Sequence, residues 1–325
     1  MNFVKMHGAG NDFVILDGVG TPLDPGHLPA LARALCAGHT GIGADGLMAA
    51  VPAKSGGDFG MLFFNADGSP GEMCGNGARC ICRYGFEHGL AGAVQHVETT
   101  AGPVVGERLD RTRYRVRLND PSLIDLHRPV EVGGTEYDCA YLELGDPGLP
   151  HAVVLLGDRD AWEPEALRAL GRALRAAPEF PKGANVSFVR LIGPDACRAV
   201  TFERGVEDFT LACGTGCASA AAALTLRGLV SGRELTVSMP GGVLGVSLTA
   251  EGGRVRDILL TGPTRLVCEG TIPGEMLEEA YAISRKQAHW NESCRRPREG
   301  RGGDSHEERK NPAARCGDDE TARRN

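Results

Sequence analysis

The sequence lacks the features of membrane-embedded and exported proteins. It has no apolar run near the roughly 18 residues that a membrane-spanning helix requires. Residues 1–8 contain no basic segment followed by an apolar one, so a secretory signal is not expected. A basic excess is also missing, because the net charge is −7 and the isoelectric point is about 5.8. Nucleic acids and anionic membranes attract basic surfaces. We therefore expect a cytoplasmic protein with no nucleic-acid or membrane partner.

A Cys-x-x-Cys pair is absent although the chain contains 11 cysteines. Without an export signal, a disulfide framework is not expected. A free cysteine usually serves as a small buried hydrophobe, and we expect this of Cys36, Cys139, Cys197 and Cys268. Glycine is the other abundant residue, with 46 of 325 positions. Many tight turns or close approaches of the backbone are therefore expected.

Large aliphatic side chains are missing from one end of the chain. Residues 284–325 contain no Leu, Ile, Val, Met, Phe or Tyr and are rich in charged residues. Such a segment cannot bury enough apolar surface to offset the entropy lost on ordering, so we predict a disordered charged tail over 284–325. The remainder is long enough for two domains with a substantial core.

Short strands dominate the rest of the sequence. Runs rich in β-forming residues are 13–17, 61–64, 114–118, 152–156 and 235–239. Leucines at helical spacing predict a helix over 28–35, and a second helix is predicted to start at Glu163-Pro164. Because strands and helices do not alternate regularly, the pattern favours an α+β fold over a doubly wound sheet.

An internal repeat divides this part into two similar halves, with a boundary near Asp120-Pro121. In one copy Phe63-Phe64-Asn65 precedes Cys74-Gly75-Asn76-Gly77, and in the other Thr201-Phe202-Glu203 precedes Cys213-Gly214-Thr215-Gly216. A helix-compatible stretch follows each cysteine and ends in Gly-Leu, with the glycine fifteen residues after the cysteine. Two matched copies predict homologous half-domains that face one another.

The placement of the two cysteines suggests a chemistry. A cysteine just before Gly-x-Gly and a helix lies where free N–H groups and the helix dipole favour negative charge, which should lower its pKa from about 8.5 toward neutrality. The glycines let a substrate carboxylate approach the backbone N–H groups. If Cys74 and Cys213 face each other across a cleft, a thiolate can remove a proton from one face of an α-carbon while a thiol returns one to the other face. The pattern therefore predicts a cofactor-independent amino-acid epimerase.

Other readings of the cysteines stay open at this point. Cys80, Cys82 and Cys217 could join the two cysteines as zinc ligands, although the spacings are not those of a Cys-x2-Cys knuckle. Cys74 and Cys213 could form a redox dithiol. The glycine-rich elements could also be structural turns with incidental cysteines.

Five motifs resemble those of the diaminopimelate epimerase family. They are Met6-His7-Gly8-Ala9-Gly10-Asn11-Asp12-Phe13, Phe64-Asn65-Ala66-Asp67-Gly68-Ser69, Met73-Cys74-Gly75-Asn76-Gly77-Ala78-Arg79-Cys80, Glu203-Arg204-Gly205-Val206 and Leu211-Ala212-Cys213-Gly214-Thr215-Gly216. The resemblance covers about residues 1–282 in the expected order. It implies two pseudo-symmetric α+β halves, each a barrel-like, mainly antiparallel sheet around a central helix, with the active site in the cleft between them. The strands near 264–271 would return to the first half, so the halves are expected to be 1–120 with 264–283, and 121–263.

The resemblance also implies an activity and its partners. LL-2,6-diaminopimelate and meso-diaminopimelate would be interconverted on the route to lysine and peptidoglycan, without pyridoxal phosphate or a metal. Diaminopimelate is then the small-molecule partner. A homodimer is expected because homodimers are usual in the family.

Individual roles follow from the matched positions. Cys74 and Cys213 match the acid/base pair, and His151 and Glu203 match auxiliary positions that orient the α-amino group and tune the bases. The positions that match substrate contacts are Asn11, Asn65, Gly75, Asn76, Asn185, Glu203, Arg204, Gly214 and Thr215. A fork-shaped guanidinium such as that of Arg204 suits a second carboxylate.

Ordinary structural roles compete with these assignments. Asn11 and Asn65 could be turn residues, Glu203-Arg204 could be a surface ion pair, and His151 could be a core histidine. The sequence also departs from the family at Leu149, where many members have an asparagine that binds substrate.

Two other functions remain possible. One is a related two-cysteine racemase acting on proline, hydroxyproline or histidine, although proline racemases commonly carry His where this chain has Asn76. The other is a binding protein on the same scaffold, which would have no reason to retain both thiols.

Overall fold

The computed structural model describes residues 1–71 and 74–295. One group of strands comprises β1 (Asn2–Gly8), β2 (Asn11–Asp17), β3 (Gly46–Val51), β4 (Phe59–Asn65), β5 (Val94–Thr99), β6 (Gly102–Arg108), β7 (Arg113–Arg117) and β17 (Arg265–Thr271). The other comprises β8 (Pro121–Val132), β9 (Thr135–Leu144), β10 (Leu149–Leu155), β11 (Asn185–Gly193), β12 (Ala196–Glu203), β13 (Asp208–Thr210), β14 (Leu235–Met239), β15 (Gly242–Glu251) and β16 (Arg254–Pro263). The helices are η1 (Pro25–His27), α1 (Leu28–Cys36), α2 (Gly75–Glu87), α3 (Pro164–Arg175), α4 (Gly214–Leu226) and α5 (Gly274–Arg295).

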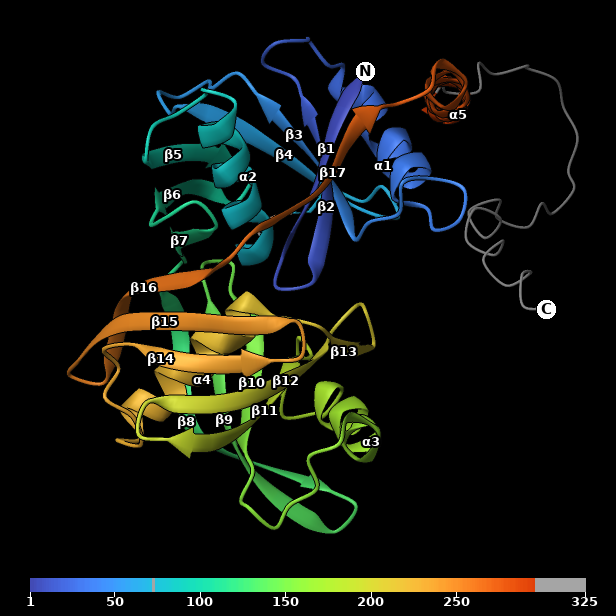
Figure 1. Ribbon diagram of the computed structural model, residues 1–325. Coiled ribbons are helices and arrows are strands. Elements are labelled where there is room, and N and C mark those ends of the chain that lie inside the picture. Colours follow the sequence, from blue (N-terminus) through green and yellow to red (C-terminus); the bar gives the residue numbers. More distant parts are fainter. Residues whose placement is uncertain (72–73, 296–325) are drawn as a thin grey trace, which may run out of the picture. The chain divides into compact units, whose positions relative to one another are not determined.

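The two groups repeat one order of strand pairing. Along β1-β2-β3-β4-β5-β6-β7, successive pairs are antiparallel, parallel, antiparallel, parallel, antiparallel and antiparallel. Along β9-β10-β11-β12-β14-β15-β16 the same order recurs. The predicted α+β fold of two similar halves is therefore confirmed (Figure 1).

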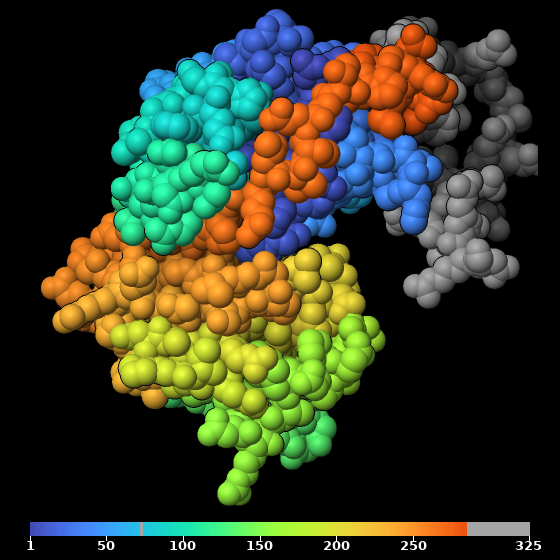
Figure 2. All heavy atoms as spheres, in the orientation of Figure 1, coloured from blue at the N-terminus to red at the C-terminus, as the bar shows by residue number. Residues whose placement is uncertain are grey.

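The first half is completed by the last strand of the sheet. β17 pairs antiparallel with β1, as β8 pairs antiparallel with β9 in the second half. β16 pairs with both β15 and β7, so the two groups form one continuous sheet. Figure 2 shows the returning segment, in orange, lying across the blue and cyan residues of the first half. On this pattern we propose the division into 1–120 with 264–283, and 121–263.

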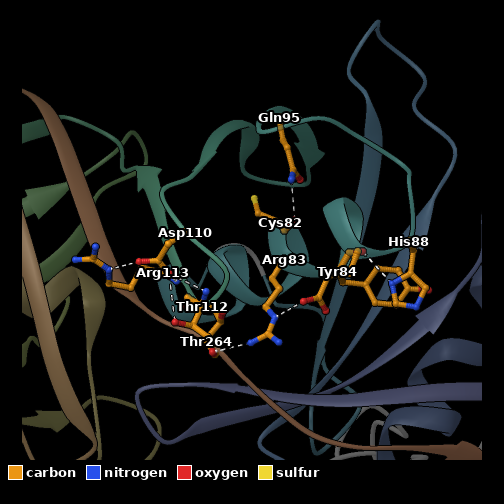
Figure 3. Close-up of polar contacts among 10 residues, drawn as sticks. Cys82, Arg83, Tyr84, His88, Gln95, Asp110, Thr112, Arg113 and Thr264 are labelled. Carbon is orange, nitrogen blue, oxygen red and sulfur yellow. Dashed lines mark hydrogen bonds and ion pairs between the residues drawn. The ribbon is translucent and has the colours of Figure 1, made fainter.

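The chain is held to α2 at the point where it leaves β16 for β17. Arg83 of α2 donates from Nη1 to the carbonyl oxygen of Thr264 at 2.9 Å and from Nε to Glu87 at 2.9 Å. The backbone N–H of Thr264 donates to the carbonyl of Thr112 at 2.7 Å. Figure 3 shows Arg83 reaching from the helix to this crossing. Because Thr264 is fully buried, these bonds satisfy backbone groups that water cannot reach.

Helices α2 and α4 form a matched pair, one in each half. Both follow a cysteine, both have 13 residues, and both end just before a glycine with φ near +70°, Gly89 and Gly228. A positive φ at this point is the usual C-terminal signal that glycine provides. Residues of both helices lie in one core cluster. The repeat predicted from the sequence therefore corresponds to two equivalent buried helices.

Two further helices cover smaller clusters of buried residues. Leu28, Leu31 and Leu35 of α1 pack with residues of β2 and β3. Leu167 and Leu174 of α3 pack with residues of β11 and β12. The predicted helix over 28–35 and the predicted helix start at Glu163-Pro164 are both confirmed.

The predicted start of the disordered tail at residue 284 is wrong. Helix α5 continues through Arg295, with Ala280 buried against α1 and its neighbours. The segment after 284 contains Ala, Glu, Gln, Lys and Arg, which favour helix even where they bury little surface. Residues 296–325 lie outside the described residues, so disorder there stays a prediction.

Three of the four cysteines expected to be buried are buried, namely Cys36, Cys139 and Cys197. The expectation for Cys268 is wrong, because this residue is exposed on β17. Among the described residues β17 pairs with β1, and most of its side chains are exposed.

No helix in the described residues is long and apolar enough to cross a membrane.

Candidate active site

Cys74 occupies the position just before the first turn of α2. Its backbone is extended, with φ −133° and ψ 117°, as is typical of the residue that precedes a helix. Cys74 is half-buried as a residue, and its Sγ donates to Oδ1 of Asn11 at 3.2 Å. Asn11 is itself held by Asp45, whose Oδ2 accepts from the Asn11 amide Nδ2 at 2.7 Å. The amide of Asn11 is therefore oriented with its oxygen toward the Cys74 thiol.

Cys213 occupies the equivalent position before α4. Its φ and ψ are −117° and 105°, close to those of Cys74. Cys213 is 6% exposed, and its Sγ accepts from the N–H of Gly216 at 3.4 Å. Thr215 Oγ1 lies 3.5 Å from the same sulfur. The first turn thus points one backbone N–H at the thiol, as expected for a helix N-terminus.

The two helices meet at these N-terminal ends. Asn76 of the first half donates from Nδ2 to the carbonyl of Ala212 in the second half, at 3.1 Å. A Cβ at position 214 would lie 3.7 Å from the Cα of Gly75 and 2.7 Å from a methyl group of Leu260. A Cβ there would meet the Leu260 side chain and would come into ordinary contact with Gly75, so the two helix ends lie close together at these glycines. The residues that adjoin Cys74 and Cys213 thus contact one another across the junction of the halves.

A second contact joins the halves beside this junction. Gly241, in the turn between β14 and β15, donates from its N–H to the carbonyl of Leu211 at 2.8 Å. Ala9 and Gly10, in the turn between β1 and β2, lie against Gly241 and Leu211. The turns from the two halves are therefore packed backbone to backbone.

Glu203, at the end of β12, lies beside the thiol of Cys213. Its Oε1 accepts from Oγ1 of Thr210 at 2.6 Å. Burial raises the pKa of Glu203, while hydrogen bonds from Thr210 and Cys213 lower it. Thr210 reaches Glu203 because β12 and β13 form a hairpin.

A third group is formed by His151, Asn185 and Arg204. His151 and Asn185 are paired residues of the parallel strands β10 and β11. Asn185 Oδ1 accepts from the backbone N–H of Arg204 at 2.8 Å. Burial, with a contribution from Arg204, lowers the pKa of His151 to about 3, so the imidazole is neutral near pH 7.

Asn65 is not brought to the thiols by any described contact. It is exposed at the end of β4, and its amide Nδ2 donates to Ser69 Oγ within its own turn at 2.9 Å. Its neighbour Ala66 donates from N–H to the carbonyl of Asp45 at 3.2 Å. The turn that holds Asn65 is thus linked to the Asn11 network through the bond between Ala66 and Asp45. Leu149, which stands where many family members have Asn, is the first residue of β10 and is half-buried.

The prediction that the pKa values of both thiols fall toward neutrality is wrong. Burial raises the pKa of Cys74, and the N–H groups of Gly77 and Asn76 oppose this only in part. Burial and the neighbouring Glu203 raise the pKa of Cys213 well above its ordinary value. Desolvation of a thiolate outweighs the helix N-terminus here, because each sulfur is surrounded by protein.

These pKa shifts predict the pH dependence of any reaction in which one of the thiols is the base. Because the pKa of each thiol is raised, the thiolate forms only as the pH rises past the ordinary thiol pKa of about 8.5. We expect log(kcat/KM) to keep rising with pH through about pH 8.5 before any plateau. A plot of log(kcat/KM) against pH that is already flat at about pH 7 would contradict a role for these thiols as the base.

Two residues of the site were missed by the sequence reading. Asp45 orients Asn11, and Thr210 holds Glu203. Asp45 lies in Gly43-Ala44-Asp45-Gly46, which reads as a turn, and its distance of 34 residues from Asn11 gives no local signal. Only the pairing of β2 with β3 brings them together.

The zinc interpretation of the cysteines has no ligand set in the described part of the chain. No group of three or more His, Cys, Asp or Glu side chains in this part could hold a metal ion.

Comparison with known proteins identifies related sequences. The protein-family model of diaminopimelate epimerase matches residues 3–124 and 145–267. The diaminopimelate epimerase of Aquifex aeolicus (strain VF5) is 38% identical over 288 residues, covering 86% of this chain and 100% of that protein. The diaminopimelate epimerase of Methanothrix thermoacetophila is 36% identical over 286 residues, covering 86% of this chain and 98% of that protein.

Solved structures with the same fold are more distant in sequence. A phenazine biosynthesis protein of the PhzF family from Bacillus anthracis has a TM-score of 0.64 at 15% identity, covering 84% of this chain and 99% of that one. A probable proline racemase from Agrobacterium radiobacter K84 has a TM-score of 0.62 at 19% identity, covering 84% of this chain and 93% of that one. These two similarities concern the fold.

Proposed function

The chain belongs to the diaminopimelate epimerase family and is an isomerase that interconverts LL- and meso-diaminopimelate, and we propose that Cys74 and Cys213 are the two bases of this reaction. The observation that carries the proposal is the meeting of the two helix N-termini. Asn76 donates to the carbonyl of Ala212, the residue before Cys213, while Asn76 itself follows Cys74 by two positions. Both thiols are therefore held at one junction between the halves.

The proposed chemistry is a proton transfer through the α-carbon. One cysteine, as thiolate, removes the α-proton and becomes a thiol. The other cysteine, as thiol, donates its proton to the opposite face of the carbanion and becomes a thiolate. The stereocentre is inverted, and the protonation states of the two cysteines are exchanged. Exchange of protons with solvent resets the pair for the next turnover.

The carbanion needs stabilisation of the charge that develops on the substrate carboxylate. We assign this to backbone N–H groups at Gly75-Asn76 and Gly214-Thr215, in the first turns of α2 and α4. The first four N–H groups of a helix have no partner within the helix. Donors fixed in place before the reaction stabilise developing charge without reorganisation.

The remaining site residues are assigned to the ammonium and distal groups of the substrate. Glu203 is placed beside Cys213 and would attract the α-ammonium group. That positive charge offsets the effect of the Glu203 carboxylate, which raises the pKa of both thiols. Neutral His151 can contribute a hydrogen bond but no charge. Arg204, Asn185, Asn11 and Asn65 are assigned to the distal amino-acid end.

The setting of the reaction is part of the proposal. We propose that the product supplies lysine and peptidoglycan synthesis in the cytoplasm and that the enzyme is a homodimer, as the family resemblance implies. Light scattering coupled to size-exclusion chromatography tests the dimer.

Solvent isotope exchange tests the activity and the two-base chemistry together. LL-diaminopimelate is incubated with the protein in deuterium oxide, and product is followed by chiral separation and mass spectrometry. Because the base that protonates the carbanion carries solvent-derived deuterium, we expect meso product with deuterium at the inverted α-carbon. L-proline and L-histidine serve as control substrates. Exchange on proline or histidine, but none on diaminopimelate, would contradict the assigned substrate.

A further inference from the structure

Arg79 is a fully buried arginine one turn after Cys74 on α2. Its Nη1 donates to the carbonyl of Gly75 at 3.1 Å, and its Nη2 donates to Oδ1 of Asn76 at 2.8 Å. Both acceptors belong to the first turn of the helix. Arg79 thus holds the two residues that follow Cys74 with the two arms of a planar group.

These bonds determine which way the Asn76 amide points. Because Oδ1 accepts from Arg79, Nδ2 is turned to the opposite side. There it donates to the carbonyl of Ala212 at 3.1 Å and approaches Oδ1 of Asn11 at 3.4 Å. Asn11 Oδ1 also accepts from the Cys74 thiol. Arg79 is therefore connected through one amide to the surroundings of both cysteines.

The charge of Arg79 is unusual for its place in the fold. An isolated cation in a protein interior costs several kcal/mol unless negative charge lies nearby. In the described residues, none of the ion pairs between side chains includes Arg79. The electrostatic partners of its guanidinium are the thiols of Cys80, Cys74 and Cys217. Burial and, less strongly, Glu203 raise the pKa of Cys74, while the N–H groups of Gly77 and Asn76 and, by a smaller amount, the charge of Arg79 lower it.

The backbone around Arg79 is shaped to admit its head group. A Cβ at position 262 would lie 2.9 Å from both Cζ and Nε of Arg79, and one at position 8 would lie 3.3 Å from Nη2. Gly262 and Gly8 belong to β16 and β1, on the two sides of the junction. The space for the guanidinium thus depends on glycine in both strands.

We propose that Arg79 is a positioning residue of the epimerisation, which orients the Asn76 amide across the junction of the halves and places a buried positive charge one turn after Cys74. This inference rests on the proposed role of Cys74. It adds a source of charge that is independent of the helix N-terminus.

A purely structural role is the competing explanation, and Arg83 provides the matched control. Arg83 lies one turn further along α2, is also buried, and donates to the carbonyl of Thr264 and to Glu87 (Figure 3). It is not among the groups that shift the pKa of Cys74. Removing Arg83 disturbs the helix and the β16–β17 crossing without removing charge beside Cys74.

The test compares Arg79→Met, Arg79→Lys and Arg83→Met. In Arg79→Met we expect kcat to fall by about 10²-fold, the usual effect of displacing catalytic groups by about 1 Å. We also expect the ascending limb of its pH–rate profile to move to higher pH, because the stabilising charge is gone. Arg79→Lys keeps the charge, so the limb stays near that of the wild type while kcat falls because the two-armed contact is lost. Arg83→Met should keep the limb of the wild type.

A second readout does not depend on turnover. The rate of Cys74 alkylation by iodoacetamide, followed on its peptide by mass spectrometry, reports the thiolate fraction as pH varies. Slower alkylation in Arg79→Met than in Arg79→Lys at equal pH supports the inference. Equal alkylation rates and an unmoved pH limb in folded Arg79→Met would overturn it.

Failure of the proposed function gives a different pattern from failure of this inference. If wild-type protein does not epimerise diaminopimelate, the alkylation rates still report whether Arg79 controls the Cys74 thiolate. If the wild type is active and the Arg79 variants alkylate like it, only the role of Arg79 is lost. Should Arg79→Met not fold, Arg79→Lys carries the test. Unchanged kcat in that variant would remove the positioning role.

Discussion

Replacing Cys213 or Cys74 with alanine is expected to lower kcat for the LL-to-meso reaction by at least about 10²–10⁴-fold, the usual contribution of a positioned acid or base. Each substitution leaves one face of the α-carbon without a proton donor or acceptor. Inversion then stops, while the remaining thiol can still remove and return a proton on its own face. We therefore expect each variant to exchange the α-proton of one stereoisomer with deuterium oxide without inverting it.

Cys217→Ala is the matched control for this experiment. Cys217 is one turn further along α4, is fully buried, and its Sγ lies 3.2 Å from Sδ of Met239. Its replacement removes a sulfur from the same helix but none from the junction. Epimerisation and exchange are measured for all three variants, with circular dichroism to establish folding. Near-wild-type kcat in either Cys74→Ala or Cys213→Ala would remove that cysteine from the mechanism.

The helical part of the site could be predicted because its signals are local. Each Cys-Gly-x-Gly element, together with a glycine fifteen residues after the cysteine, marks both ends of a helix. Both helices have the predicted bounds to within a few residues. The equivalence of the two copies then indicates equivalent positions for Cys74 and Cys213.

The sequence predicts an α+β fold and some of its strands, but not how the strands pair. Individual strands such as β14 follow from β-forming residues, but nothing local specifies that β2 pairs parallel with β3 or that β16 pairs with β7. These pairings join segments far apart in the sequence, and they bring Asp45 to Asn11. For the same reason, the sequence predicted Cys74 and Asn11 as site residues but not Asp45, which orients Asn11.

The thiol pKa values cannot be predicted from the Cys-Gly-x-Gly motif alone. A helix N-terminus favours a thiolate, and the backbone N–H groups at Cys74 and Cys213 act in that direction. Burial acts in the opposite direction and is larger, but burial depends on the packing of both halves. The sequence therefore identifies the donors correctly and predicts the wrong direction for the pKa.

The packing of the two halves depends on a glycine that no catalytic motif contains. A Cβ at position 241 would lie 2.0 Å from the carbonyl oxygen of Ala9 and 3.0 Å from Cβ of Leu211. The first of these atoms belongs to the backbone of the other half, so it cannot rotate away as a side chain could. Leu211 lies two residues before Cys213, and Ala9 two residues before Asn11. A shift of the backbone at Ala9 or Leu211 therefore also displaces Asn11 or Cys213.

Gly241→Ala is accordingly expected to lower kcat by about 10²-fold, because displacement of catalytic groups by about 1 Å has a cost of that size. The added methyl must separate the turns at Ala9 and Gly241, which draws the surroundings of Cys74 and Cys213 apart while leaving every proposed catalytic group in the chain. Gly92→Ala is the control, since a Cβ at position 92 has no atom within 4 Å. Steady-state kinetics and thermal unfolding are measured for both variants. If folded Gly241→Ala has the kcat of the wild type, the prediction fails. Contact between these two turns would then not be needed to hold the two thiols at the distance that inversion requires.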